Sequence, residues 1–433
     1  MKYDHNKNEI VSPTAEIPIT ISTTAIGLYN RNGNIDTNTD AFGKLRVSNP
    51  YTLFDSNFRY DNAPTKWNSG NSLSSSITHL ANASTVALTV GTASGSTAIR
   101  ETNKVMHYQP GKSLLIMNSF CMSPIQDNLR QRIGYFNIKN GIFLELNNSI
   151  LYIVKRSYVT GSAVDTRIPQ SDWNINRLDG FDRNLGSFTL NISKTQIFWS
   201  DIEWLGVGSV RCGFVINGQY IPCHIFHHAN SESDVYMTTA SLPLRCEIEA
   251  TGTLTSTATF KQICSTVISE GGYELAGTPK TIGLQVDKPK ILVSANTLYP
   301  AVSIRLKASN LDSIVLPKQL SLVGTTASDY RYVFISNADI IGANWQSVSN
   351  NSVVEYNANA NSTMSTANAI NLIQGYFVST GSTSPTIQLD SQLFKYQLSS
   401  NSFSNSSITL TVAVEAIANN DKVLASLDWE ELS

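Results

Sequence analysis

The pair Asn217-Gly218 constrains this chain most, because it lies between two apolar runs in the stretch from Gln196 to Asn230. Asn-Gly is the strongest two-residue hairpin signal, since both positions tolerate a positive φ. A two-residue loop also sets the register. Counted from the turn, Phe214 faces Ile221, Cys212 faces Cys223, and Arg211 faces His224.

A third predicted strand, from Gln196 to Trp204, precedes the hairpin. Its alternation places Phe198, Ile202 and Trp204 on one side and Trp199, Asp201 and Glu203 on the other. These runs indicate an antiparallel sheet with an apolar inner face and a polar, aromatic outer face. Pro222 cannot donate a ladder hydrogen bond, which predicts a sheet edge or a bulge beside it.

Composition excludes several classes of protein. Charged residues make up 15% of the chain, below the roughly 25% of an average soluble protein, and the net charge is −2. Ser, Thr and Asn take their place and favour strands and turns over long helices. We expect no nucleic-acid partner, because no basic footprint is present. We also expect no membrane span, because no apolar run reaches about 20 residues.

The chain divides into three predicted parts. Residues 1–39 are predicted to be an N-terminal arm, for which two interpretations stand: a poorly ordered terminus, or an arm that packs along a neighbouring subunit. Residues 40–277 carry short apolar runs about 8 to 12 residues apart, a spacing typical of sandwiches and barrels. Residues 278–433 are predicted to form a second, smaller β-sandwich. Within them, the tract from Asn350 to Asn371 is predicted to be a long surface excursion.

Two carboxylates, Asp201 and Glu203, share one predicted strand face, and paired carboxylates are what glycoside hydrolysis needs. The strand resembles the E-x-D-x-E catalytic strand of retaining β-glucanases with the concanavalin-like jelly roll. Trp199 occupies the first Glu position, so the retaining mechanism is not available to this chain. Three interpretations remain: a solvated strand face, a sugar-binding face with Trp199 as a stacking platform, and an active glycosidase.

The histidines and cysteines indicate no metal or cofactor. His224, His227 and His228 form an HxxHH pattern, but on a strand His227 points away from the other two. Two opposed cysteines, Cys212 and Cys223, are expected to be buried thiols in a reducing compartment.

Five long segments resemble virion structural proteins of marine tailed bacteriophages, particularly those that infect cyanobacteria. They are DAFGKLRVSNPYTLFDS, RETNKVMHYQPGKSLLIMNSF, LRQRIGYFNIKNGIFLEL, DIEWLGVGSVRCGFVINGQYIPCHIFHHAN and STVISEGGYELAG. The resemblance covers roughly Asp40 to Gly277 and continues more loosely through SIRLKASN and DWEEL. It implies a particle component, and it carries no catalytic residues onto this chain.

The expected fold is therefore all-β: a lectin-type, concanavalin-like jelly-roll sandwich followed by a smaller β-sandwich. The expected function is a non-enzymatic component of a tailed-phage virion, in the tail, baseplate or head exterior. It would be made in the host bacterial cytoplasm and would assemble as a homo-oligomer with other virion proteins. The alternative is a receptor-binding module that recognises host surface carbohydrate through the outer sheet face, with Trp199, Asp201, Glu203, Arg211 and His224 as its residues.

Overall fold

A computed structural model describes residues 49–181, 188–379, 386–389, 395–401, 403 and 406–432, and the backbone of two short paired strands, β1 (Tyr3–Asp4) and β2 (Glu9–Ile10). The rest of the predicted N-terminal arm lies outside the described residues. Within these ranges the chain forms strands and two short 3-10 turns, Ala81–Ala83 and Gln170–Asp172. The expected all-β class is confirmed. No helix of the described residues is long and apolar enough to cross a membrane.

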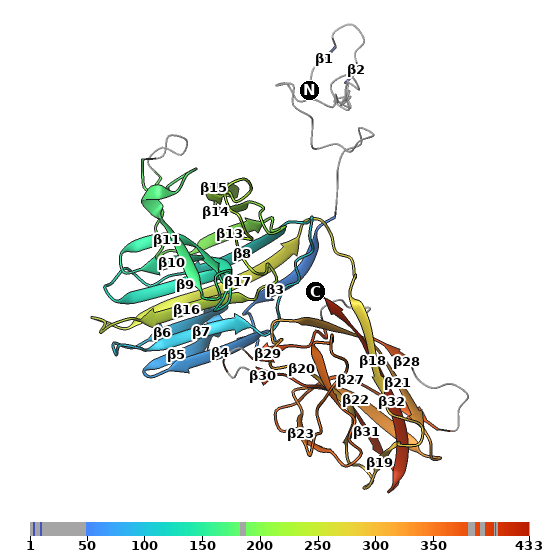
Figure 1. Cartoon of the computed structure of the whole chain (residues 1–433). Coiled ribbons are helices and arrows are strands. Elements are labelled where there is room, and N and C mark those ends of the chain that lie inside the picture. The colour runs from blue at the N-terminus through green and yellow to red at the C-terminus, as the bar shows by residue number, and fades with distance from the viewer. Residues whose placement is uncertain are drawn as a thin grey trace. The chain divides into compact units, whose positions relative to one another are not determined.

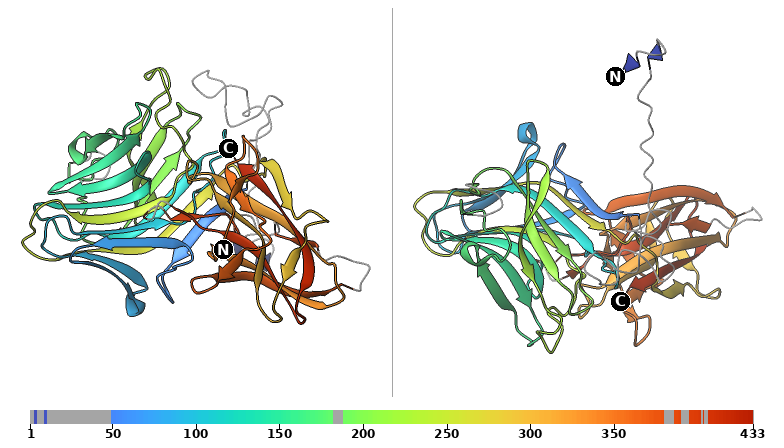
Figure 2. Two further views of the ribbon diagram at one scale, coloured as in Figure 1. Left: turned by 60° about the horizontal axis from the view of Figure 1, so that its bottom comes forward. Right: turned by 90° about the horizontal axis from the view of Figure 1, so that it is seen from above.

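Two antiparallel sheets form the first sandwich (Figures 1 and 2). The seven-stranded sheet has the order β12 (Val164–Pro169), β11 (Ile150–Ser157), β10 (Gly141–Asn147), β9 (Leu129–Phe136), β16 (Leu244–Ala250), β7 (Thr97–Thr102) and β4 (Trp67–Ser72). The eight-stranded sheet has the order β15 (Gln219–Phe226), β14 (Val210–Ile216), β13 (Gln196–Ile202), β8 (Leu114–Cys121), β17 (Ala258–Ser269), β6 (Thr85–Val90) and β5 (Ser75–Leu80), with β3 (Tyr51–Asn57) also paired to β17. This is the expected lectin-type jelly-roll sandwich.

Strict alternation along the strands builds the first core. Ile133 and Leu144 from the seven-stranded sheet meet Ile116, Phe198 and Phe214 from the eight-stranded sheet, and all five are fully buried. Every second residue of these strands therefore points away from the shared core. Those outward positions decide what each sheet face can do.

The Asn217-Gly218 hairpin forms as predicted at its turn. Asn217 and Gly218 adopt φ values of 50° and 77°, as a two-residue loop of this kind requires. Phe214 lies opposite Ile221, but the register shifts by one residue between Gly213 and Cys212. This irregularity directly follows Pro222, and β15 is the edge strand of its sheet, so the interpretation of Pro222 is confirmed.

The second sandwich begins with β18 and uses the rest of the chain. One sheet has the order β18 (Thr278–Gly283), β32 (Asp421–Leu432), β21 (Ile314–Gly324) and β28 (Thr386–Gln388), with β19 (Lys290–Leu292) also paired to β32. The other has the order β24 (Gln346–Ser347), β25 (Val354–Asn357), β20 (Tyr299–Leu306), β31 (Leu410–Ala416), β22 (Asp329–Ser336) and β27 (Ile370–Val378). Two short pairs complete it, β23 (Asp339–Ile341) with β26 (Thr363–Ser365), and β29 (Ser400–Asn401) with β30 (Ser406–Ser407).

The Asn-rich tract is not the surface excursion that composition predicts. It contains β25, β26 and the start of β27. Met364 of β26 and Ile340 of β23 pack against buried Val333 and Ile335 of β22. Most of the asparagines lie outside these strands, although Asn357 belongs to β25 and Asn371 to β27, and apolar residues of the tract such as Met364 help to cover one face of the six-stranded sheet.

Candidate functional site

Trp199 lies on the outward face of β13, as predicted, but it is not an exposed platform. Its side chain is only 5% exposed. A Cβ at Gly213 would approach Trp199 Cζ2 to 2.8 Å, so the indole lies directly over that glycine. Tyr220 packs edge-on against the indole at 5.7 Å between ring centroids. A sugar ring has no access to the face of this tryptophan.

The two predicted carboxylates do not act as a pair. Asp201 is buried and accepts a hydrogen bond from Arg211 Nη2 of the neighbouring strand. Glu203 is exposed and follows the end of β13 at Ile202. Arg211 is therefore the partner of Asp201. On the other neighbouring strand, Arg211 lies opposite Ile225 and not opposite His224, as the expected register had it.

His224 points to the opposite face from the one predicted. The shift beside Cys223 places His224 opposite Cys212, so Cys212 and Cys223 are not opposed, although both thiols are buried. The His224 ring packs against Phe226 at 4.6 Å, and Phe226 belongs to the first core. Burial, with a smaller contribution from the charge of His227, lowers the pKa of His224 to about 4. His224 is a neutral inner residue and not part of an outward binding face.

The HxxHH pattern does not form a ligand set. His228 stacks on Tyr236 at 3.8 Å between centroids, and its Nδ1 donates to Gly208 O at 2.6 Å. His227 Nδ1 lies 3.3 Å from Ser209 Oγ on the exposed side. In the described part of the chain, no group of three or more His, Cys, Asp or Glu residues could hold a metal ion.

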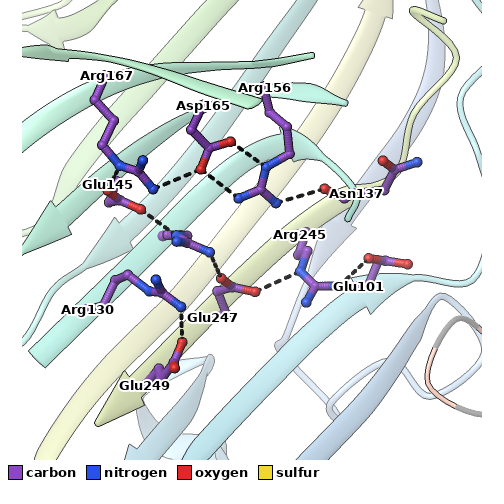
Figure 3. Close-up of polar contacts among 11 residues, drawn as sticks. Glu101, Arg130, Asn137, Glu145, Arg156, Asp165, Arg167, Arg245, Glu247 and Glu249 are labelled. Carbon is purple, nitrogen blue, oxygen red and sulfur yellow. Dashed lines mark hydrogen bonds and ion pairs between the residues drawn. The ribbon is translucent and has the colours of Figure 1, made fainter. Parts of the chain in front are cut away.

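The polar feature that dominates the first sandwich lies instead on the outward face of the seven-stranded sheet. Eight residues form one continuous chain of ion pairs across six strands, and a ninth and tenth, Arg130 and Glu249, pair beside it (Figure 3). The order of the chain is Glu101, Arg245, Glu247, Arg132, Glu145, Arg167, Asp165 and Arg156. We call these ten residues the arginine–carboxylate network.

Arg132 is at the centre of the network. Its Nε donates to Glu145 at 2.6 Å and its Nη1 donates to Glu247 at 2.7 Å. Glu145 also accepts from Arg167 Nε at 2.7 Å and has no solvent exposure. Glu247 also accepts from Arg245 Nε at 2.8 Å. Each central charge is thus held by more than one partner, which is what a buried ion pair needs to offset its desolvation.

Two phenylalanines extend the network. Phe136 and Phe143 stack at 4.3 Å between centroids and form a small buried cluster with Val154. The guanidinium carbon of Arg156 lies 5.1 Å from the Phe143 centroid, and that of Arg245 lies 5.8 Å from the Phe136 centroid. These cation–π contacts hold the arginines against the sheet.

The electrostatics of the network do not suit general acid catalysis. Burial alone would raise the pKa of Glu247, but the charges of Arg245 and Arg132 and their hydrogen bonds outweigh it and lower that pKa. The same opposition, with Arg156 and Arg167 as the cations, lowers the pKa of Asp165. A glycosidase acid needs a raised pKa, because it must hold its proton near neutral pH. These two carboxylates are held ionised and serve to tie strands together.

The sequence contains a signal for this network. Charged residues alternate with apolar or amide residues along two strands. They are Arg130 and Arg132 on β9, and Arg245, Glu247 and Glu249 on β16. Period-2 alternation of charge with inner residues such as Ile133 and Ile248 marks a charged strand face. It does not tell which strands are neighbours, so the pairing needs the fold.

The chain is similar to several solved structures, all at low sequence identity. No family model and no curated protein sequence matches the chain. Among solved structures, a β-1,3-1,4-glucanase (lichenase) from a mouse hindgut metagenome matches at 9% identity and a TM-score of 0.34, covering 51% of this chain and all of that one. A legume lectin-like domain from Entamoeba histolytica matches at 13% identity and a TM-score of 0.31, covering 51% of this chain and 97% of that one. A protein of unknown function from Shewanella oneidensis matches at 9% identity and a TM-score of 0.35, covering 53% and 91%.

Proposed function

We propose that this chain is a non-enzymatic structural component of a tailed-bacteriophage virion, assembling with other particle proteins in the tail, baseplate or head exterior. The observation that carries the proposal is the resemblance of its long segments to virion structural proteins of marine tailed phages. One of those segments, LRQRIGYFNIKNGIFLEL, supplies β9 and β10 and with them Arg132 and Glu145 at the centre of the network.

The chemistry of the first sandwich is consistent with a scaffold. Its buried carboxylates are paired with arginines, and the strand that resembles the E-x-D-x-E strand of retaining β-glucanases has Trp199 packed over Gly213 in place of a nucleophile. Ion pairs that cross six strands join those strands through their side chains as well as through the backbone ladder. The same features support the absence of catalysis.

Assembly contacts are supported by apolar side chains at exposed loop positions. Tyr60, Leu73, Ile138, Phe181 and Val286 are each largely exposed on loops. Aromatic residues such as Tyr60 and Phe181 are enriched where subunits meet. They are candidate contact points with neighbouring virion proteins.

The test is the protein inventory of purified particles. Particles of the phage that encodes the chain should contain it, after gradient purification and mass spectrometry, at the abundance of a repeated structural protein. A chain found in infected-cell lysate but absent from purified particles would overturn the proposal. A reducing-sugar assay of the recombinant chain on mixed-linkage β-glucan should show no release above buffer, and a specific release would contradict its non-enzymatic nature.

A further inference from the structure

The six-stranded sheet of the second sandwich has an outward face that is covered only in part. On β22, Tyr330 and Phe334 enter the second core, whereas Val333 and Ile335 point to the other side. Val333 and Ile335 are fully buried under the β23–β26 pair, with Leu298 and Ala369 beside it. Arg331 shares their face, but its side chain remains 27% exposed. The face is therefore open at the end of the sheet where β22 begins.

A row of three side chains crosses this open end. Register places Glu415 of β31, Arg331 of β22 and Tyr376 of β27 side by side. Arg331 Nη1 donates to Glu415 Oε1 at 2.8 Å, and Arg331 Nη2 lies 3.2 Å from Gln374 Oε1. The guanidinium is thereby fixed in orientation beside the tyrosine. Tyr376 is 77% exposed and lies near the end of β27, the edge strand of the sheet.

The row borders a hollow of about 470 Å³. The remaining rim comes from the ends of the same strands and one loop. Exposed apolar residues Val378 and Ile417 lie on it, with Asp329 and Asn296 as polar neighbours. Its volume falls within the range of about 300 to 1,000 Å³ that small-molecule sites occupy.

We propose that this hollow binds a neutral saccharide. An exposed tyrosine ring offers an apolar face with a polar edge, which matches the C–H face of a pyranose ring. Beside it, Arg331 and Glu415 present N–H donors and a carboxylate acceptor a few ångströms apart, which matches a pair of vicinal hydroxyl groups. Because the pair is already formed, these groups are oriented before the ligand arrives, and little side-chain entropy is lost on binding.

The charges of the hollow select against acidic ligands. Arg331 balances Glu415, and Asp329 on the rim leaves one net negative charge among the lining residues. Phosphate, sulfate or a sialic acid carboxylate would meet this charge without a free cation in the lining. The ligand class is therefore a neutral hexose or N-acetylhexosamine unit. This inference does not depend on the proposed virion role.

The experiment uses the full chain on an array of neutral oligosaccharides built from glucose, galactose, mannose and N-acetylglucosamine, with sialylated and sulfated glycans on the same array. The strongest neutral probe is then titrated by saturation-transfer NMR. We expect neutral glycans to bind, and Tyr376→Ala to weaken binding about tenfold or more, since a stacking aromatic is a typical hot spot. Tyr60→Ala removes another highly exposed tyrosine, on the first sandwich, and should leave affinity unchanged.

Several outcomes would overturn the proposal. One is that the full chain, folded as judged by its all-β circular dichroism spectrum, binds no neutral glycan on the array. Others are binding confined to sialylated or sulfated glycans, and neutral binding that Tyr376→Ala leaves intact. A fourth is a change of oligomeric state in Tyr376→Ala during ultracentrifugation, because that result would make the hollow a contact between copies of the chain. Arg331→Gln provides a second variant, and it too should weaken neutral-glycan binding.

Discussion

Glu145 accepts a hydrogen bond from Arg132 Nε at 2.6 Å while its side chain has no solvent exposure. The pair joins β9 to β10 on the face that points away from the main core. A carboxylate in this position survives only because Arg132 and Arg167 both hold it. The stability of the first sandwich therefore depends on buried ion pairs on the outward face of a sheet as well as on the apolar core.

Removing Glu145 should be costly. Glu145→Ala leaves Arg132 and Arg167 short of a partner in a buried setting, and we expect a loss of about 3 to 5 kcal/mol in the free energy of unfolding. Glu249→Ala is the matched control, because Glu249 pairs with Arg130 at a part-exposed position and should cost under about 1 kcal/mol. Urea unfolding followed by tryptophan fluorescence measures both. Equal losses in the two variants would show that burial of the network is not what matters.

Acid should destabilise the chain in two steps. The pKa of His224 is lowered to about 4 by burial, so between about pH 6.5 and pH 4 the unfolded state takes up a proton that the folded state refuses. The contribution of His224 to the free energy of unfolding is complete above about pH 6.5 and is lost as the pH falls from there toward 4. The lowered pKa values of Glu247 and Asp165 add a second loss below about pH 4, where the unfolded carboxylates become protonated.

Thermal melts across this pH range test the order of events. The melting temperature should decline from about pH 6.5 downward in the native chain. His224→Gln should flatten the decline between about pH 6.5 and pH 4, with His228, whose pKa is also lowered chiefly by burial, supplying what remains. A melting temperature that rises as the pH falls through this range would contradict the buried, neutral state of His224.

Replacing Trp199 with alanine should destabilise the protein more than replacing Arg211, although the two residues share a sheet face. Trp199→Ala opens space over Gly213 and beneath Tyr220, and we expect a loss of about 3 to 5 kcal/mol. Phe214→Ala should cost a similar amount, because Phe214 is fully buried. Arg211 is 59% exposed, but Arg211→Ala leaves the buried carboxylate of Asp201 without this partner, so we expect an intermediate loss of about 1 to 3 kcal/mol. A melt in which Arg211→Ala is the most damaging of the three would reject this assignment of faces.

The predicted N-terminal arm leads to an assembly test. A variant that begins at Asp40 should fold normally, because the sheets of the first sandwich start at Tyr51. If residues 1–39 contact a neighbouring subunit, this variant should enter particles poorly in a complementation assay. Normal incorporation would remove the arm from any role in assembly.

Local signals predicted much of the central sheet. Asn217-Gly218 determines its own turn, because positive φ at both residues is a property of those two side chains. Pro222 likewise marked a sheet edge or a bulge. The sequence did not show how many extra residues the irregularity would contain. It contains one, Cys223, and this one-residue shift places His224 on the inward face instead of the outward one.

Long-range pairing was beyond the sequence. Arg132 and Glu247 are 115 residues apart, and nothing local says that β9 and β16 are neighbours. The charged alternation of both strands is visible, but only the sheet order brings them together. In the same way, Glu415, Arg331 and Tyr376 become a row through pairing alone. Period 2 predicts which residues share a face, and strand order decides which of them form a site.

We propose that this chain is a structural subunit of a tailed-phage particle. Electron cryomicroscopy of purified particles, at a resolution that separates strands, tests this proposal. We expect density in the tail, baseplate or head exterior that accommodates the seven- and eight-stranded sheets and the second sandwich in several symmetry-related copies. A complete particle map with every subunit assigned to other proteins, and no density for these sheets, would contradict it.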